Sequence, residues 1–361
     1  MKRGEENHRA HASFSLAHFS VLVAILVAES HAVGEASIRS FTFSGRTQPH
    51  FVKYLAVPGH PLGDLQQLAV GADGALWFTE TTTPAIGRID SQARVSTFLL
   101  PSAAGEPMAI TPGPDGNIWF SFYGPPQGLG RLAMTGKMTT FPQSYPGGRI
   151  WGMTAGPDRN IWFTDWDANL VGRMTTSGKP TLYQLKEMGG PNGITIGPDG
   201  ALWIAEQGAL SGSQQTPGRI LRMALDGRLL SSFPLSPRSW QTAPVNITSG
   251  ADGNLWFTEG EQTGHPWNIE RITLHGAITK FWLGRNDIGF SGLALGSDGN
   301  MWITEGEKKL ARVTPNGDVT EFFIPKPGSN EAQPRGIVSG PLGDLWFVET
   351  TAGSIGQFNP H

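Results

Sequence analysis

GPDGALWIAE, at residues 197–206, decides the fold because six other segments of the chain repeat its pattern. The seven copies are GADGALWFTE from Gly71, GPDGNIWFSF from Gly113, GPDRNIWFTD from Gly156, GPDGALWIAE from Gly197, GADGNLWFTE from Gly250, GSDGNMWITE from Gly296 and GPLGDLWFVE from Gly340. Their Trp residues fall at 77, 119, 162, 203, 256, 302 and 346, in steps of 42, 43, 41, 53, 46 and 44 residues. Such steps are typical of one four-stranded propeller blade, and the repeated Trp is expected to form a core wedge between blades.

Around each copy apolar and polar residues alternate with a period of two, which indicates β-strands. Residues 191–196 predict an inner strand, 198–200 a tight turn and 201–206 a second strand. The last unit supplies only three strands before His361, and residues 53–58 resemble residues 320–325. We therefore predict an all-β fold, a seven-bladed propeller over residues 53–361 with antiparallel blades, which the N-terminal strand closes by completing the last blade.

Composition restricts the class of protein. The chain of 361 residues is 39% hydrophobic with 12 Trp and 19 Phe, so it is expected to fold around a large core. It has no Cys, which excludes disulfides and Cys-ligated zinc. The net charge is -3 and no Lys/Arg cluster follows the N-terminus, so we expect no nucleic-acid partner. We expect a monomer.

The N-terminus has the pattern of an export signal. Lys2 and Arg3 precede an apolar stretch over residues 14–28, and Ser30-His31-Ala32 is a small-x-small pattern. The apolar run is shorter than the roughly 20 residues of a spanning helix, so an uncleaved anchor is the less favoured alternative. We predict a signal peptide at 1–32, an extension at 33–52, no stable membrane span, and export to the periplasm or the cell exterior.

The repeats also carry a family resemblance. Units of the form Pro-x-Gly-Ile-Thr-x-Gly-Pro-Asp-Gly-Asn-Ile-Trp-Phe-Thr-Glu, followed by Ile-Gly-Arg-Ile, resemble the virginiamycin B lyase (streptogramin B lyase) family over nearly all of residues 53–361. The resemblance implies a seven-bladed propeller whose lyase members open a cyclic depsipeptide antibiotic at its ester linkage by elimination, with Mg²⁺ and a general base. Membership alone does not establish that activity.

One position near the start of each inner strand is expected to line the mouth of the channel. In blade order these mouth positions hold Gln66, Met108, Trp151, Asn192, Val245, Ser291 and Arg335. Variation inside a strict repeat indicates a ligand-facing surface, because packing alone would favour one residue type seven times. The alternative is neutral variation around a solvated channel.

The resemblance places His at the mouth positions of blades six and seven, and a metal-binding Glu two residues before the last His. This chain has Ser291, Arg335 and Gln333 at those places. Arginine cannot act as a base, because its pKa lies above about 12. The family's Glu at the end of the second strand of blade seven is matched by Glu349.

Acids end most of the repeated segments, which close with Glu80, Phe122, Asp165, Glu206, Glu259, Glu305 and Glu349. An arginine of the expected third strand also recurs, at Arg88, Arg131, Arg173, Arg222, Arg271 and Arg312, with Gln357 in the last unit. One interpretation is a ring of acids that holds Mg²⁺ or Ca²⁺, with Glu349, Gln333 and Glu305 as ligands. The favoured alternative is a set of Glu–Arg pairs between neighbouring strands. Since Gln357 leaves Glu349 without its arginine, Glu349 is the candidate special carboxylate.

Elaborated loops point to the same face, at residues 123–128, 207–217 and 260–267. Their aromatic residues, with Trp151, predict a platform for an apolar, ring-bearing or sugar ligand, formed by Tyr123, Trp151, Trp166 and Trp267. His60 and His265 are candidates for a relocated acid or base, the alternative being that each is a solvated loop histidine.

Three functions remain open. The first is an enzyme of the virginiamycin B lyase type, acting on a cyclic or ester-linked substrate with Mg²⁺ or Ca²⁺ and no organic cofactor. Its candidate catalytic residues are Glu349, Arg335, Ser291, His265 and His60. The second is a ligand-binding or scaffold propeller without catalysis. The third is a metal-dependent, lactonase-like hydrolase.

Overall fold

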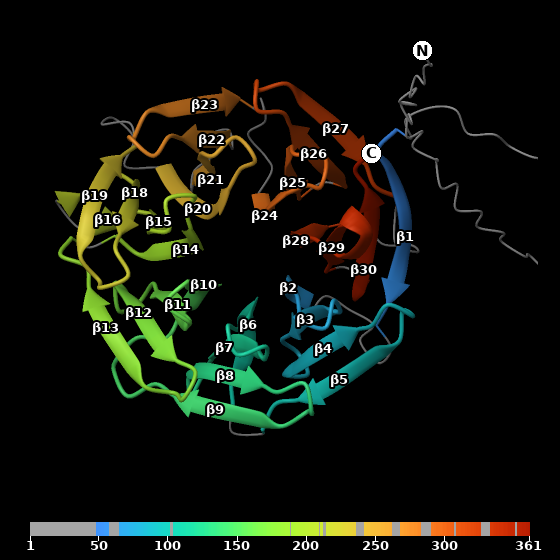
Figure 1. Ribbon diagram of the computed structural model, residues 1–361, viewed down its shortest axis with the longest axis horizontal. Helices are drawn as coiled ribbons and strands as arrows, with labels where there is room; N and C mark the ends of the chain where they lie inside the picture. The colour runs from blue at the N-terminus through green and yellow to red at the C-terminus, as the bar shows by residue number, and fades with distance from the viewer. Residues whose placement is uncertain are drawn as a thin grey trace, which may run out of the picture. The chain divides into compact units, whose positions relative to one another are not determined.

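The strands pack as seven four-stranded antiparallel sheets arranged in a ring, as predicted (Figure 1). This computed structural model describes residues 48–57, 65–101, 104–187, 189–208, 210–211, 214–235, 242–261, 268–282, 290–306, 308–325, 333–350 and 352–361. Residues 1–47, with the predicted signal peptide and most of the extension, lie outside this part. Within the described ranges no helix has the length and apolar character of a membrane span.

Each blade runs from the centre outward in chain order. Blades one to three are β2 (Leu65–Val70), β3 (Leu76–Glu80), β4 (Ala85–Ile89) and β5 (Val95–Leu99); β6 (Glu106–Pro112), β7 (Ile118–Tyr123), β8 (Gly128–Leu132) and β9 (Met138–Pro142); and β10 (Ile150–Ala155), β11 (Asn160–Asp165), β12 (Leu170–Thr175) and β13 (Pro180–Gln184). Blades four to six are β14 (Pro191–Ile196), β15 (Leu202–Glu206), β18 (Arg219–Met223) and β19 (Leu229–Pro234); β20 (Thr242–Ser249), β21 (Leu255–Glu261), β22 (Asn268–Ile272) and β23 (Ile278–Trp282); and β24 (Phe290–Leu295), β25 (Met301–Glu305), β26 (Lys309–Val313) and β27 (Val319–Phe323).

Blade seven joins the two ends of the propeller. Its strands are β28 (Pro334–Ser339), β29 (Leu345–Glu349), β30 (Ser354–Asn359) and, from the N-terminal side, β1 (His50–Ala56). Tyr54 lies opposite Gly356, and its hydroxyl donates to the Pro325 carbonyl at 2.7 Å, which ties β1 to blade six. The predicted closure is confirmed; β1 begins at His50, inside the predicted extension. The smaller elements are the hairpin β16 (Leu210–Ser211) and β17 (Gln214–Gln215), and the 3₁₀ turn η1 (Pro341–Gly343).

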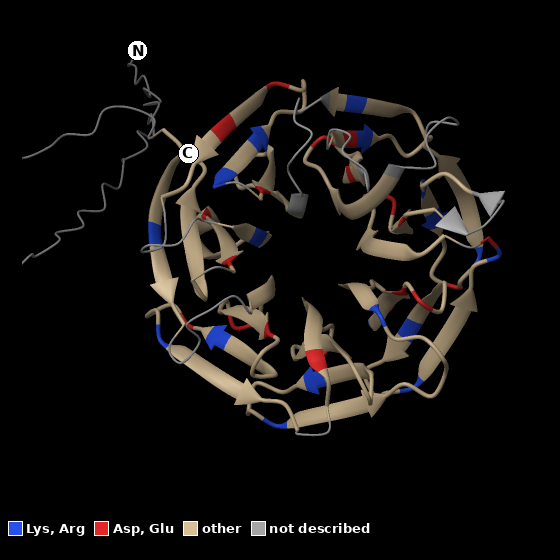
Figure 2. Ribbon diagram, turned by 180° about the vertical axis from the view of Figure 1, so that it is seen from behind, with Lys and Arg blue, Asp and Glu red and all other residues tan. Residues whose placement is uncertain are grey.

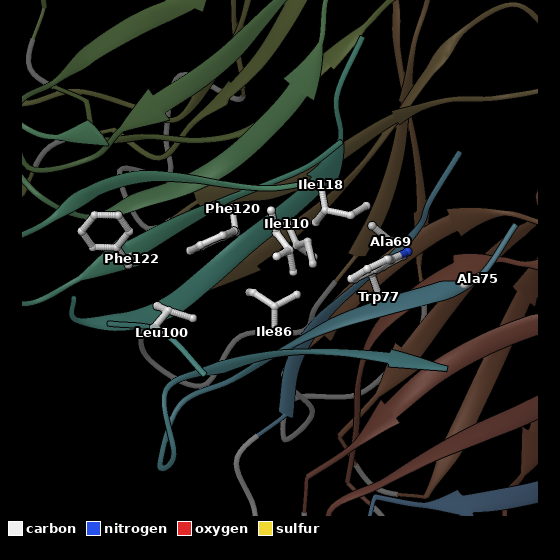
Figure 3. Packing of buried hydrophobic residues seen from close by; sticks show 10 residues of the cluster. Ala69, Ala75, Trp77, Ile86, Leu100, Ile110, Ile118, Phe120 and Phe122 are labelled. Atoms are coloured by element: carbon white, nitrogen blue, oxygen red, sulfur yellow. The ribbon is translucent and has the colours of Figure 1, made fainter. Parts of the chain in front are cut away.

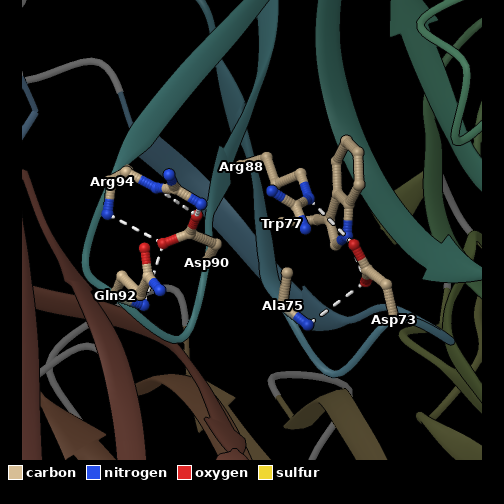
Figure 4. Close-up of polar contacts among 7 residues, drawn as sticks. All are labelled: Asp73, Ala75, Trp77, Arg88, Asp90, Gln92 and Arg94. Atoms are coloured by element: carbon tan, nitrogen blue, oxygen red, sulfur yellow. Dashed lines mark hydrogen bonds and ion pairs between the residues drawn. The ribbon is translucent and has the colours of Figure 1, made fainter.

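An Asp, a Trp and an Arg form the same contact in successive blades. In blade one, Asp73 Oδ1 accepts hydrogen bonds from the Ala75 amide (3.2 Å) and from Trp77 Nε1 (3.1 Å), while Oδ2 accepts from Arg88 Nε at 2.8 Å (Figure 4). The Arg88 guanidinium also lies 5.6 Å from the centre of the Trp77 ring. Burial opposes ionisation of Asp73, but the bonds from Trp77 and Arg88 outweigh it and lower its pKa.

Five of the six repeated arginines therefore bind the turn aspartates, and the favoured pairing with the acids that end the second strands is wrong for these five. The ion pairs are Arg88–Asp73, Arg131–Asp115, Arg173–Asp158, Arg222–Asp199 and Arg271–Asp252, at 2.6–4.0 Å. The reason is the register, because Trp77 lies opposite Arg88 and Glu80 opposite Ala85, at the other end of the strand pair.

The repeated Trp residues fill the seams between blades, as predicted. Six of them are at most 1% exposed and Trp346 is 8% exposed. Trp77 and Ile86 of blade one pack with Ile110, Ile118 and Phe120 of blade two (Figure 3). Each Trp thus couples the turn of its own blade to the next blade.

Blade seven lacks the contact between Asp, Trp and Arg that blades one to five repeat. Leu342 replaces the aspartate, is 98% exposed and adopts a φ of +64°. Asp344, two residues later, accepts instead from Gln357 Nε2 at 2.5 Å and Asn359 Nδ2 at 3.1 Å. Among the described residues, nothing accepts a hydrogen bond from Trp346 Nε1.

Blade seven provides a control for measuring how much the Asp–Trp–Arg contact contributes to stability. Asp199→Ala in blade four leaves Trp203 Nε1 without its acceptor and Arg222 without its carboxylate. We expect a loss of about 2 kcal/mol in the free energy of unfolding, measured by chemical denaturation. Leu342→Ala, at the equivalent turn, should change it by less than about 0.5 kcal/mol. Equal effects of the two substitutions would contradict the role given to the aspartate.

Candidate functional site

Residues from the inner strands of blades one to six line a polar cavity. Its volume is about 250 Å³. Its polar lining residues are Gln67, Thr154, Asn192, Thr195, Asn246 and Thr248. Trp151 and Gly193 also line it. The cavity is therefore bounded mainly by amides and hydroxyl groups.

Charge is nearly absent from the inner strands. Their sequences contain only two charged residues, Glu106 and Arg335. Figure 2 shows that Lys, Arg, Asp and Glu gather mainly on the outer strands and connecting loops. Arg335 is exposed, and its Nη1 donates to Gln66 Oε1 at 3.3 Å. The structure thus brings together the mouth residues of blades seven and one, with a cation at this point of the mouth.

The other mouth residues divide into two groups. Trp151 and Asn192 line the cavity. Met108 and Val245 are half-buried, and in their blades the cavity is lined instead by the next residues, Ala109 and Asn246. Ser291 lies in β24, but its side chain is outside the described part.

A β-bulge explains why the cavity is lined by different neighbours in different blades. In blade one the register shifts between Leu65 and Leu68, so Gln66 and Gln67 have no opposite partner in β3. The same shift occurs between Pro244 and Ile247 in blade five. Within a bulge the alternation of faces breaks down, and sequence periodicity cannot say which of two successive residues faces the centre.

Hydroxyl groups of the second strands hold this bulged backbone. Thr79 Oγ1 accepts from the Gln67 amide at 3.2 Å and donates to the Met108 carbonyl of the next blade at 3.0 Å. Ser121 makes the same pair of bonds, to the Ala109 amide (3.0 Å) and the Ile150 carbonyl (2.8 Å). Thr164 repeats it in blade three. Sequence reasoning missed these residues, although a hydroxyl follows the aromatic residue in WFTE and WFSF.

Aromatic side chains are exposed at blades two and three. Tyr123, at the end of β7, is 44% exposed and Trp151 is 38% exposed. Beside them the Arg149 guanidinium lies 4.1 Å from the centre of the Trp166 ring and pairs with Asp167. Tyr123 and Trp151 are thus exposed aromatic side chains, and the platform for a ligand stays a prediction. Trp267 lies outside the described residues.

The histidine predictions stay untested, because His60 and His265 lie outside the described residues. The three described histidines lie away from the inner strands. His50 begins the outer strand β1, His275 lies between β22 and β23, and His361 contacts Ser297 at 2.9 Å. No described histidine therefore reaches the cavity.

Glu349, the candidate special carboxylate, is fully buried and bound to backbone amides. It accepts from the Gln333 amide through Oε1 and from the Ala352 amide through Oε2, the latter at 3.1 Å. Asp165 makes comparable bonds to the amides of Gly148 (3.2 Å) and Ala168 (3.0 Å). These acids hold the loops that lead into and out of their blades.

The described residues do not fit the expected cation. Among them no group of three or more His, Asp and Glu residues could hold a metal ion. Glu349 uses both oxygens on amides, Gln333 meets it through its backbone, and Glu305 ends β25 in blade six. Since both Glu349 oxygens are bound to amides, the set of Glu349, Gln333 and Glu305 as cation ligands stays a prediction.

Blade five contains an acid where blades one, two, three and seven have glycine. Glu270 lies opposite Phe257, as Gly87 lies opposite Phe78, where any Cβ would meet the ring at 2.0 Å. Glu270 and Glu259 are 3% and 4% exposed, and Lys280 Nζ lies 2.9 Å from Glu270 Oε1 and also pairs with Glu259. Burial, with a hydrogen bond to Glu259 and its charge, raises the pKa of Glu270 to about 8.

Comparison of the sequence with known families agrees with the propeller fold. The sequence profile of the Virginiamycin B lyase family matches residues 57–217 and 205–361. The chain belongs to the virginiamycin B lyase family. It is similar to the virginiamycin B lyase of Nocardia farcinica, with 27% identity over 298 residues that cover 82% of this chain and 80% of the relative.

Solved structures of the virginiamycin B lyase family share the architecture. A streptogramin B lyase structure superposes with a TM-score of 0.74 at 29% identity, covering 86% of this chain and 98% of the other. The virginiamycin B lyase of Staphylococcus aureus gives 0.73 at 28% identity, covering 85% and 98%. A catalytically inactive His-to-Ala variant of that enzyme, with quinupristin, gives 0.71 at 28% identity, with the same coverage.

The amide bonds of Glu349 predict a structural effect that does not depend on metal. Glu349→Gln replaces one acceptor oxygen by a donor that faces a backbone N–H, so the variant should melt below the wild type. We expect the same decrease in EDTA, Mg²⁺ and Ca²⁺, measured by calorimetry. An ion that raises the wild-type melting temperature, but not that of the variant, would contradict this and restore the metal site.

The raised pKa of Glu270 predicts a pH-dependent effect on stability. Because the folded state favours the neutral acid, its contribution is complete below the ordinary pKa and is lost as pH rises toward about 8. Glu270→Gln keeps a neutral side chain, so its melting temperature should rise relative to wild type by about 2–4 °C for each kcal/mol lost between pH 6 and 9. Glu106→Gln, at an exposed carboxylate, should show no such trend. Parallel curves for Glu270→Gln and wild type would disprove the effect.

Proposed function

We propose that this member of the virginiamycin B lyase family is a ligand-binding propeller. It holds a small molecule at the mouth of its channel and does not open the ring of a streptogramin by elimination. The observation that carries the proposal is Arg335, an exposed guanidinium held by Gln66 where the family resemblance expects histidine. A guanidinium binds carbonyl and anionic groups well but cannot accept a proton at neutral pH.

The histidine dependence of a related enzyme also favours ligand binding without elimination. The Staphylococcus aureus enzyme is catalytically inactive as a His-to-Ala variant, so that enzyme depends on a histidine. This chain has Ser291 and Arg335 at the mouth positions where the resemblance places histidine. The amide-bound Glu349 likewise offers no free carboxylate to replace a missing base.

Export is the second part of the proposal. Residues 1–32 have the charged, apolar and small-residue regions of a secretory signal. A propeller without Cys needs no oxidative folding step outside the cell, because its stability comes from packing. A periplasmic or extracellular location also suits a binding role better than inactivation of an antibiotic in the cytoplasm.

The lyase remains the second candidate because one observation favours it, namely the 0.74 TM-score with a streptogramin B lyase over 86% of this chain. Quinupristin, the compound in the related Staphylococcus aureus structure, distinguishes the two functions. The purified chain is incubated with quinupristin and Mg²⁺, and the products are analysed by mass spectrometry, with the Staphylococcus aureus enzyme as positive control.

We expect intact quinupristin at the level of the enzyme-free control, because no imidazole base is provided at the mouth positions. Linear product formed over many turnovers would contradict the proposal and support a lyase with a relocated base. Repeating the assay with His60→Ala and His265→Ala would then identify that base.

A further inference from the structure

The walls of the cavity indicate the class of ligand, an inference that rests on the proposed binding function. Three amides line the cavity, from Gln67, Asn192 and Asn246, together with threonine side chains below them. Amides both donate and accept, and so do the hydroxyl groups of a polyol. A cavity of about 250 Å³ with such walls suits a hydroxyl-rich molecule better than an apolar one.

Asn246 gives the most specific sign of a missing partner. It lies at the bulge of β20, where blades two, three and four have Ala109, Gly152 and Gly193. Its backbone amide is bound to Thr258 Oγ1 at 3.2 Å, which fixes its position. Its Nδ2 is buried and has no acceptor among the described residues. An unpaired buried donor costs about 1–3 kcal/mol. Because Asn246 lines the cavity, a rotation of its side chain that turns Nδ2 toward the cavity would let an acceptor on a ligand restore this energy.

Trp151 supplies a surface for a ring at the same cavity. It is 38% exposed, whereas the six most buried repeat tryptophans are at most 1% exposed. It comes from β10 and is followed by Gly152, which also lines the cavity. The indole face offers a flat, apolar surface with no competing side chain at the next position, which favours stacking of a pyranose ring.

Arg335 adds a requirement for negative charge. It is the only cation of the inner strands, and it lies against Gln66, next to the cavity residue Gln67. The one inner-strand acid, Glu106, begins β6 in blade two, while Arg335 lies in β28 of blade seven. Among the described residues Arg335 contacts one neutral amide, so most of its donors are open to a carboxylate.

We propose that the channel binds an acidic sugar chain. A pyranose ring of this ligand stacks on Trp151, and its hydroxyl groups bind the amides of Asn192 and Asn246. A carboxylate of a neighbouring sugar unit binds Arg335 beside Gln66. Because blades seven and three lie on different sides of the ring, the ligand must contain more than one sugar unit to reach both (Figure 1).

Calorimetric titration tests this with digalacturonate and with its dimethyl ester, which has the same rings without the charges. We expect the wild-type chain to bind the acid at least tenfold more tightly than the ester, with a preference that falls as salt increases. Arg335→Gln should remove the preference while both sugars still bind weakly. Arg94→Ala, which removes an equally charged side chain from an outer turn, should leave both affinities unchanged.

Asn246→Leu should weaken the acid and the ester by the same factor, since its amide contacts hydroxyl groups common to both. Asn246→Ala, which removes the donor without adding charge, is the second variant if the leucine variant does not fold. Equal binding of acid and ester by the wild type would overturn the inference. Binding of quinupristin but of neither sugar would overturn it and leave the proposed function standing, whereas binding of none of the three would overturn both.

Discussion

The contact on which the structure depends is the hydrogen bond from an indole N–H to the aspartate of the preceding turn, closed by an arginine from the third strand. In blade four Asp199 Oδ1 accepts from Trp203 Nε1 at 3.1 Å and Oδ2 from Arg222 Nε at 2.6 Å. One carboxylate thus fixes the turn, the start of the second strand and the register of the third. The indole that it orients fills the seam to the next blade, so the same contact sets how the blades stack.

This arrangement leaves the centre of the ring free to vary. The stabilising contacts lie at the turns between the first and second strands and in the seams, while the mouth residues are held through backbone bonds to hydroxyls such as Thr79 and Ser121. A side chain on an inner strand can therefore change without loss of the frame. The same family frame can in this way carry a histidine in one member and Arg335 in another, and function follows from the mouth residues.

The repeat predicted the blades, their number and the closing strand, because each unit must bury one Trp in the same manner. Pairing details were harder to predict. The partner of each repeated arginine depends on which residues lie opposite each other across the second and third strands. The alternation of side chains along the strands is compatible with a partner at either end of the second strand. The bulge at Gln66 and Gln67 hides which residue faces the cavity. Glu270 shows a third limit, because its burial beside Glu259 and Lys280 requires three strands in register.

In this propeller a rigid frame is separate from a binding mouth, and the ¹⁵N spectrum of the indole N–H groups tests that separation directly. On addition of digalacturonate we predict that the Trp151 signal shifts, while the six indoles bound to turn aspartates keep their positions and their slow hydrogen exchange. A Trp151 signal that does not move, or frame signals that shift together with it, would contradict the account.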